Sequence, residues 1–462
     1  MRAVKSVIAG ISVDRRLMKG SLLALLITGE ILLGYLIAVR PQDPYLIPGA
    51  AVGLIVVAVT FMEPVFGLYL FVATAFTEAL LMFGSVSAAR LLGILVLVAW
   101  ITRSLAGGRF EIIMPGHAWF AAMLISWGLM SALWAMDAQG LPSALLLLVQ
   151  LMALYILVIN LVNSVRKIKI VLAIIMIVSL ALALLTILRV VSGELVEGRV
   201  DLGQISVGDP NVQAAYFLPS ATLLMILFSH KAQLSQKLLL LLGFSVITLA
   251  ILATSSRGAL VSLVVIFVLG MIIDRRLWQV ALPTLLVGGV AWLFLPHTLV
   301  EHLEALVTLS DRGAGRVDIW LVALEIIRSH PALGVGLDSF GRAFDKYVSE
   351  TPGIMRDIGR GRGSHNIFLN VQSELGVIGS ALFVVFIGMS LRSGLVAVVN
   401  WRRAGSPRTA ALALAVFLSL VGVLVVGLFL DVQYWKLFWL LLALPEVMRR
   451  LSVEALQGTT SR

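Results

Sequence analysis

The chain alternates between long apolar runs and short polar connections over most of its length. An apolar run of about 20 residues is long enough to cross the hydrocarbon core of a bilayer as a helix. The pattern therefore predicts an all-α polytopic membrane protein with about 12–14 transmembrane helices; the weakest spans are 45–62, 88–102 and 434–448. The predicted spans are residues 20–39, 45–62, 65–83, 88–102, 116–135, 142–163, 168–191, 212–229, 237–254, 258–273, 277–296, 374–398, 409–430 and 434–448.

One connection, residues 297–370, is far longer than the others and is rich in Arg, Asp, Glu, His, Gly and Pro. Polar and irregular segments are costly in a membrane protein, because the bilayer core cannot solvate them. We therefore expect function to concentrate in this loop. Within the loop, residues 316–328 have the spacing of an amphipathic helix. Its expected apolar stripe is Trp320, Ala323, Leu324 and Ile327, with Asp318, Glu325 and Arg328 elsewhere on the wheel.

The same loop contains clear signals for where its helices end and begin. Pro331 is expected to stop the amphipathic helix, and Gly334 and Gly336 to bend the chain after it. Ser364 is a good N-cap for the next apolar helix, which would place His365 in its first turn.

Composition agrees with the membrane interpretation and narrows the chemistry. The mean hydropathy is +1.02, with 60% hydrophobic and 13% charged residues, values outside the soluble globular range. The absence of cysteine excludes disulfides, thiolate metal sites and cysteine nucleophiles. His297 and His302 lack a carboxylate constellation for zinc, so no metal site is expected.

The net charge of +10 comes from Lys and Arg concentrated in alternate connections between the spans, so it indicates membrane topology and not a nucleic-acid-binding surface. Every second connection is short and basic, which places those connections and both termini in the cytoplasm and the long loop outside. The basic N-terminus leads into an apolar run without a small-residue cleavage site, so a signal peptide is not expected. The expected domains are a cytoplasmic segment 1–19, a helical bundle 20–296, the outer loop 297–370, C-terminal helices 371–448 and a cytoplasmic tail 449–462.

Two arginines on the outer side are candidates for a functional role. Arg257 follows a tight Thr-Ser-Ser turn at the start of a helix, and its guanidinium fork would bind phosphate oxygens in pairs. The alternative is an interfacial arginine that reaches the lipid headgroups. Arg316 lies four residues before Trp320 and shares its helix face; a cation–π contact or an ion pair is equally compatible with that position.

His365 is the candidate general base. It follows an arginine-rich, glycine-rich segment at a helix N-terminus, where positive charge and the helix dipole would lower its pKa and keep the imidazole neutral. A lone histidine is nevertheless more often structural. Further candidate substrate-binding residues are Arg199, Asp209, Asn211, Arg312, Trp320, Arg360, Arg362 and Asn366, with Asp209 and Asn211 also typical of a helix cap.

Several short motifs occur in a fixed order from residue 209 onward. They are Asp209-Pro210-Asn211, Ser256-Arg257-Gly258-Ala259, Gly315-Arg316-x-x-x-Trp320, His330-Pro331-x-x-Gly334-Val335-Gly336, His365-Asn366-x-x-Leu369 and Glu374-Leu375-Gly376-x-x-Gly379. Each motif is weak alone. The ordered set resembles the O-antigen ligase/O-antigen polymerase superfamily of bacterial envelope glycosyltransferases.

The resemblance implies an enzyme of the bacterial inner membrane that works without a metal, nucleotide or other cofactor and whose active site faces the periplasm. It implies transfer of a glycan from an undecaprenyl-diphosphate carrier to lipid A–core by a ligase, or to another lipid-linked glycan by a polymerase. The functional residues that it carries over are Arg257, Arg316 and His365. Membrane lipid is an expected partner, and nucleic acid is not.

The residues leave several functions open. A ligase and a repeat-unit polymerase share a donor and a chemistry, and a protein O-oligosaccharyltransferase would differ only in its acceptor. A transporter or flippase would be expected to show broken helices paired between two repeats and charges at the middle of the membrane. The concentration of polar residues in one outer loop favours catalysis.

Overall fold

The computed structural model describes residues 46–78, 82–83, 86–107, 111–193, 209–231, 233–294, 315–354 and 359–460. Apart from turns and loops, the described chain is helical, with one pair of two-residue antiparallel strands, β1 (Met82–Phe83) and β2 (Val86–Ser87). Its helices are α3 (Leu46–Met62), α4 (Pro64–Thr74), α5 (Ala88–Ala106), α6 (Ala118–Met130), α7 (Leu141–Leu161), α8 (Val165–Val191), α9 (Pro210–His230), α10 (Leu234–Ala253), α11 (Arg257–Ile273), α12 (Trp278–Phe294), α14 (Arg316–Ser329), α15 (Phe340–Tyr347), α16 (Ile367–Arg403), α17 (Pro407–Val426) and α18 (Lys436–Thr460), with short 3-10 turns η1 (Ser131–Leu133), η2 (Arg275–Leu277) and η3 (Val432–Tyr434).

The all-α polytopic class predicted from the apolar runs is confirmed. Seven of the described helices are long and apolar enough to cross a membrane, and shorter apolar helices accompany them. Boundaries agree within a few residues for most spans; α9, for example, was expected at 212–229 and occupies Pro210–His230. The predicted span 20–39 lies outside the described residues. The span predicted at 65–83 is wrong at its end, because α4 stops at Thr74.

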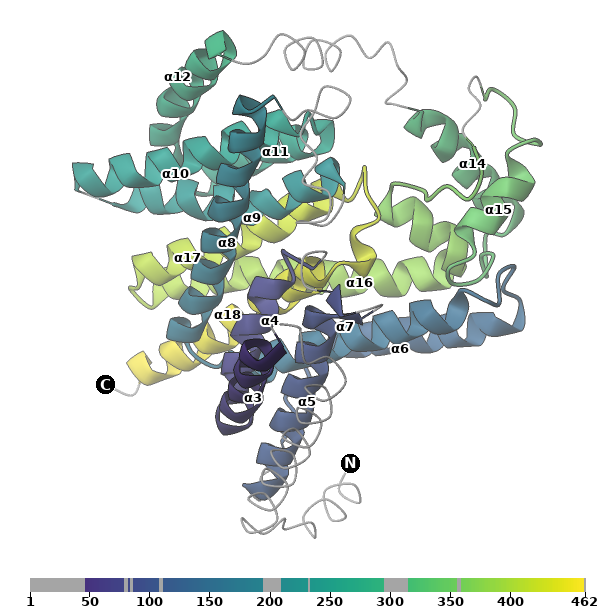
Figure 1. Cartoon of the computed structure of the whole chain (residues 1–462), viewed down its shortest axis with the longest axis horizontal. Helices are drawn as coiled ribbons and strands as arrows, with labels where there is room; N and C mark the ends of the chain where they lie inside the picture. The colour runs from purple at the N-terminus through teal and green to yellow at the C-terminus, as the bar shows by residue number, and fades with distance from the viewer. Residues whose placement is uncertain are drawn as a thin grey trace.

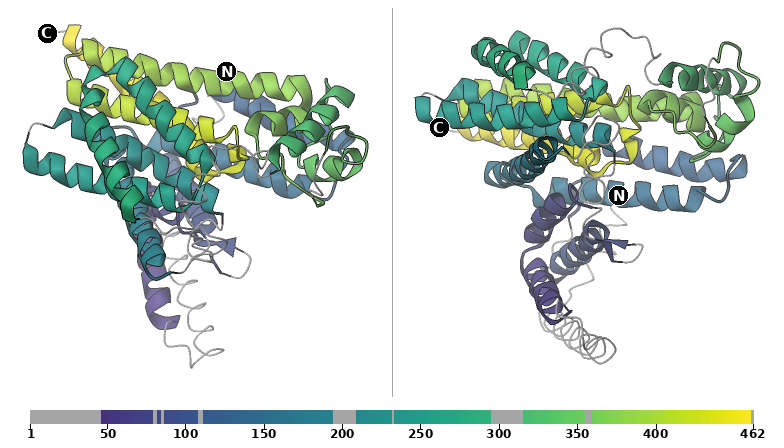
Figure 2. Two further views of the ribbon diagram at one scale, coloured as in Figure 1. Left: turned by 90° about the horizontal axis from the view of Figure 1, so that it is seen from above. Right: turned by 45° about the horizontal axis from the view of Figure 1, so that its top comes forward.

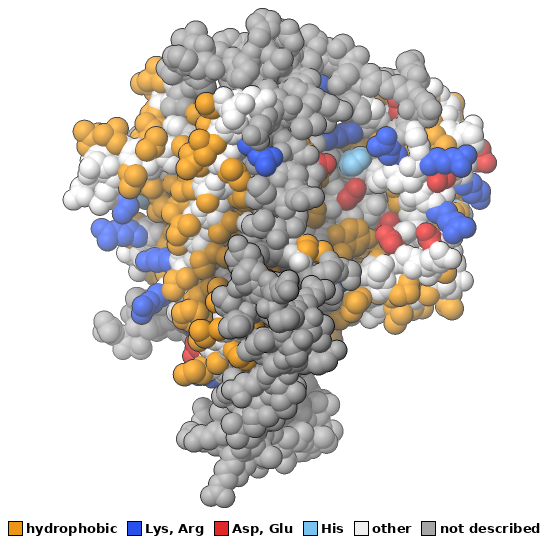
Figure 3. Space-filling view, in the orientation of Figure 1, with side chains coloured by type: hydrophobic (Ala, Val, Ile, Leu, Met, Phe, Trp, Pro, Cys, Tyr) orange, Lys and Arg blue, Asp and Glu red, His pale blue; other side chains and the backbone are white. Residues whose placement is uncertain are grey.

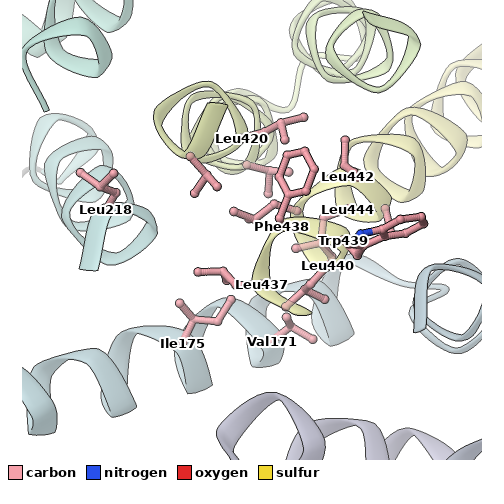
Figure 4. Close-up of a cluster of buried hydrophobic side chains, with 14 of the residues drawn as sticks. Val171, Ile175, Leu218, Leu420, Leu437, Phe438, Trp439, Leu440, Leu442 and Leu444 are labelled. Carbon is pink, nitrogen blue, oxygen red and sulfur yellow. The ribbon is translucent and has the colours of Figure 1, made fainter. Parts of the chain in front are cut away.

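The centre of the bundle is built on α9 and α17. Nearly every residue of α9 is buried, and α17 is buried along most of its length. Small side chains such as Ala214, Ala215 and Ser220 let neighbouring helices approach α9 closely, as is usual inside membrane bundles. The cluster in Figure 4 gathers Leu218 of α9, Leu420 of α17 and the Phe438–Trp439 pair of α18. These buried helices form the rigid frame for the loops at their ends.

The two ends of the bundle differ in the segments that cover them. In Figure 1 and both views of Figure 2, α14 and α15 lie at the end opposite the C-terminus. They form a small separate core in which Val322 and Ile326 of α14 meet Phe340 and Phe344 of α15. This satellite packs on the first turns of α16, where the Ser373 hydroxyl donates to the carbonyl of Ala323 at 3.5 Å.

The predicted apolar face of the amphipathic helix is wrong by about one residue. The buried stripe of α14 is Ile319, Val322, Ala323 and Ile326, whereas Leu324 is 53% exposed. Asp318, expected on the polar side, is completely buried. The helix uses the face that fits α15 and α16, and that choice depends on partners far away in the sequence.

Backbone hydrogen bonds attach the small core formed by α14 and α15 to α16. The amides of Val335 and Gly336 donate to the carbonyls of Ser373 and Glu374, each at 2.9 Å. A Cβ at Gly334 would overlap the carbonyl group of Glu374, and Gly376, with φ of 62°, breaks the helical geometry of α16 at this point. Glycine is required because two backbones touch, which explains why the Gly-Val-Gly and Glu-Leu-Gly motifs occur together.

Candidate active site

His365 lies in the short non-helical segment before α16, which Asp431 holds in place. One carboxylate oxygen of Asp431 accepts from the Ser364 hydroxyl at 2.7 Å and from the Asn366 amide at 3.3 Å. The other accepts from the His365 amide at 3.1 Å. His365 itself has a φ of 49°, in the left-handed region that costs a side chain about 1–2 kcal/mol. Asp431 therefore stabilises a conformation that the segment would not adopt alone.

The cap of the following helix is Asn366 and not Ser364. The Asn366 side-chain oxygen accepts from the amides of Phe368 and Leu369 at 3.0 and 3.1 Å. The Asn366 amide group also donates to the carbonyl of Leu428 at 3.1 Å. The expectation that Ser364 caps the helix and puts His365 in its first turn is wrong, because Ser364 is bonded to Asp431. His365 precedes the cap.

The pKa of His365 is lowered, in the direction that the sequence indicated, but for a different main reason. Burial is the largest cause, because it disfavours the charged imidazolium. The charges of Arg316 and Arg362 lower the pKa further, and those of Asp431 and Asp209 oppose them. Charges from three distant segments and from the neighbouring Arg362 thus act on one imidazole. Figure 3 shows acidic and basic side chains gathered around a histidine on the α14–α15 side of the molecule.

Aromatic contacts join the helices that carry Arg257 and Arg316 to the His365 segment. Trp320, one turn after Arg316 in α14, donates from Nε1 to the carbonyl of Ser364 at 3.2 Å. Its ring lies 6.3 Å from that of Phe429 between centroids. A Cβ on Gly258, the residue after Arg257, would lie 3.0 Å from the Phe429 ring. The start of α11, the start of α14 and the segment before α16 therefore adjoin one another.

The remaining candidates have different surroundings. Asp209 caps α9, accepting from the Asn211 amide at 2.7 Å and from its side chain at 3.1 Å. The capping interpretation is therefore correct for Asp209, whereas Asn211 lies in the first turn of α9 as a donor to that cap. Arg360 and Arg362 are exposed beside Gly361, whose amide donates to Asp345 at 2.7 Å. The candidates Arg199 and Arg312 lie outside the described residues.

A polar cavity of about 600 Å³ opens beside this segment. Its walls come from the loop, from the two connections that contain Asp137 and Asp431, and from the start of α16, including the buried Glu374. The pKa of Asp338 at its edge is raised by partial burial and by the nearby charge of Asp137. Carboxylates together with the Tyr434 hydroxyl provide many acceptors for sugar hydroxyls. The cavity is lined by Asp137, Asp338, Phe340, Arg342, Asp345, Arg362, Asn370, Glu374, Asp431 and Tyr434.

Sequence reasoning missed Asp431 and the carboxylates of this cavity. Asp431 is 66 residues from His365 in sequence, in the connection between α17 and α18, and it stands in no motif. An aspartate in a short outer connection was the only available signal. Within the described ranges, no group of three or more His, Asp or Glu side chains has the arrangement of a metal site.

The fold and this site define a multi-pass α-helical membrane protein with an imidazole, arginines and a polar cavity at one end of the bundle. Residues 240–384 match the family model described as O-antigen ligase. The resemblance to the O-antigen ligase/polymerase superfamily is thereby confirmed, and with it a general role in transfer of lipid-linked glycans. The match includes Arg257, Arg316 and His365 but not Asp431. No curated protein matches the chain.

The hydrogen bonds that Asp431 accepts from residues 364–366 lead to a prediction for Asp431→Asn. The side chain of asparagine has only one acceptor oxygen, so it cannot accept from the backbone amides of His365 and Asn366 and from the Ser364 hydroxyl at once. His365 then loses its fixed position, and we expect turnover to fall about tenfold. Because the Asp431 charge raises the pKa of His365, its removal should also move the acidic limb of the pH profile to lower pH.

The control is Asp274→Asn, which removes the charge of another carboxylate that contacts a histidine, His230 at 2.8 Å, at the opposite end of the bundle. Rates across a pH series would be measured for both variants. If Asp431→Asn kept the wild-type rate and the acidic limb of its pH profile did not move, the hydrogen bonds to Asp431 would not be required for activity.

Proposed function

We propose that this protein is an O-antigen ligase that transfers a glycan from undecaprenyl diphosphate to a sugar of lipid A–core. The observation that carries the proposal is the meeting of His365 with Arg316 and Arg362 in a half-buried site, inside the segment that matches the ligase family. The reaction occurs on the periplasmic side of the bacterial inner membrane, and both termini lie in the cytoplasm. The alternation of short basic connections supports that orientation.

Arg257 and Arg316 bind the diphosphate of the donor. Each guanidinium presents paired N–H donors that match phosphate oxygens, and each stands at the first turn of a helix, where the dipole also favours an anion. As the bond between the anomeric carbon and the diphosphate breaks, negative charge grows on the leaving group. The arginines stabilise that charge, and the carrier departs as undecaprenyl diphosphate.

His365 activates the acceptor. Its neutral imidazole takes the proton of an acceptor hydroxyl while the hydroxyl oxygen forms the new bond to the anomeric carbon. The attacking oxygen approaches from the side opposite the diphosphate, so the configuration at that carbon inverts. The polar cavity beside His365 holds the acceptor sugar. Its carboxylates and Asn370 accept and donate hydrogen bonds to hydroxyls, and Phe340 provides an apolar surface.

Deletion of the gene, followed by analysis of carrier-linked and surface glycans, tests this function. We expect full-length polymer to remain on the carrier and bare lipid A–core to reach the surface. Core capped with single repeats would instead identify a repeat-unit polymerase. Normal surface glycan would contradict both activities.

The charges around His365 predict the effect of Arg362→Gln on pH dependence. A base works only when it is unprotonated, so activity falls as the pH drops through the pKa of His365. The Arg362 charge lowers that pKa, so its removal should raise the pKa and move the acidic limb to higher pH, opposite to Asp431→Asn.

Transfer rates measured across a pH series, at saturating donor, would locate the limb. Arg360→Gln is the matched control, because Arg360 is an exposed arginine two residues away that does not contribute to the lowered pKa. An unmoved limb in Arg362→Gln would mean that another group controls the profile.

A further inference from the structure

At the end of the bundle opposite His365, four helix ends surround a second cavity. Its volume is about 680 Å³, and its residues come from the N-terminal half of α8, the first turns of α10 and α17 and the last turns of α9. The proposed glycan transfer does not use this cavity. Figure 3 shows basic side chains at this end of the molecule, at the edge of a band of hydrophobic side chains.

The rim of the cavity is cationic. Lys169, Lys231 and Arg408 line it, and among the described residues no carboxylate does. Within the same ranges, none of the three forms an ion pair. His230 also lines the cavity but contacts Asp274, 2.8 Å away. The rim therefore carries an excess of positive charge that nothing in the described chain neutralises.

Helix dipoles add to this charge. Two helices of 20 residues each, α10 and α17, begin at the cavity, where Gln233 precedes α10 and Arg408 is the second residue of α17. The positive end of a helix favours an anion, and its first amides have no partner within the helix. Gln233 and Gln236 supply further neutral donors. The combination matches a phosphate group better than it matches any neutral polar ligand.

The deeper walls of the cavity are apolar. They consist of side chains such as Leu172, Met176, Leu223 and Leu412, which offer no hydrogen bonds. A free phosphate ion would use only the rim and leave these walls unfilled. A phospholipid would place its phosphate between the cations and its acyl chains along the apolar walls. Basic pockets between membrane helices are known to select anionic headgroups in this way.

We propose that this cavity is a binding site for one anionic phospholipid of the surrounding membrane. The headgroup phosphate lies between Lys169, Lys231 and Arg408, and the acyl chains lie against α8, α9 and α17. The site is independent of glycan transfer, so its occupancy and the transfer activity can be tested separately.

Native mass spectrometry of the full chain in mild detergent would measure the bound lipid. We expect phosphatidylglycerol to bind at least tenfold more tightly than phosphatidylcholine, because each basic side chain contributes about fivefold in affinity for an anionic headgroup. The combined change Lys169→Gln, Lys231→Gln and Arg408→Gln should abolish that preference. Arg275→Gln, Arg392→Gln and Arg403→Gln remove equal charge from exposed positions that do not line the cavity, and should keep it.

A second variant separates lipid from free phosphate. Ala173→Phe reduces the space between the apolar walls of the cavity and keeps every cation, so it should also weaken phosphatidylglycerol binding. An unchanged preference in the triple variant would overturn the proposal. Complete displacement of the lipid by millimolar inorganic phosphate, together with normal binding by Ala173→Phe, would show an anion site without acyl-chain recognition and would also overturn it.

Discussion

Replacement of His365 should reduce glycan transfer by about 10²–10⁴-fold while the protein still binds its lipid-linked donor. The imidazole is half-buried, and burial together with the charges of Arg316 and Arg362 lowers its pKa and so favours the neutral form. Among the described residues, no other histidine contacts the segment around His365. The Nε2 atom of His330, for example, lies 3.0 Å from the Tyr347 hydroxyl. Loss of the base removes proton transfer but leaves the arginines that hold the diphosphate.

Two substitutions at this position make the test sharp. His365→Ala removes the base, but alanine is strained at a φ of 49°. His365→Asn also removes it, and asparagine tolerates the left-handed conformation. Both variants should lose transfer in proteoliposomes and retain binding of labelled carrier lipid, whereas His330→Gln should behave as wild type. Near-normal turnover in His365→Asn would end the assignment of His365 as the base.

Arg257→Lys should lower turnover by on the order of 100-fold or more, equivalent to the roughly 2.7–4 kcal/mol that one lost transition-state donor costs in other enzymes. Lysine keeps the charge but cannot make two parallel contacts to a diphosphate. Arg257 begins α11, and its backbone is held by the packing of Gly258 against Phe429. A shifted ammonium cannot compensate for the lost geometry.

The measurement is the initial rate of transfer at saturating donor, compared with donor affinity. Arg90→Lys is the matched control, because Arg90 is an exposed arginine in the first turn of another apolar helix, α5. We expect that variant to transfer normally. Full activity of Arg257→Lys would reduce the role of Arg257 to that of a simple positive charge.

Much of the fold was predictable because helices in a membrane are specified locally. The apolar runs gave the ends of α9 and α11 within about two residues, since composition and helix length are properties of each segment alone. The prediction for α14 was correct in its limits and wrong in its buried face. That face depends on α15 and α16, and their positions are not encoded in the period of α14 itself.

The sequence singled out two residues that the structure brings close together, but not the residues that hold them in place. His365 and Arg316 stood out because each occurs in a recognisable motif, and they do lie near each other. Asp431 could not be found, because it acts across 66 residues through hydrogen bonds to backbone amides that any residue possesses. The cap at Asn366 was misassigned for the same reason: the partner of Ser364 is Asp431.

The sequence by itself determined the class of protein, the limits of most membrane helices and the family of residues 240–384, because hydrophobicity, length and short motifs are readable one segment at a time. Only the tertiary structure decided which segments meet. It brought Asp209, Arg316 and Asp431 around one imidazole, fixed the face of α14, and grouped three cations at the opposite end of the bundle. Those arrangements depend on how buried helices pack against one another, and packing partners lie far apart in the chain.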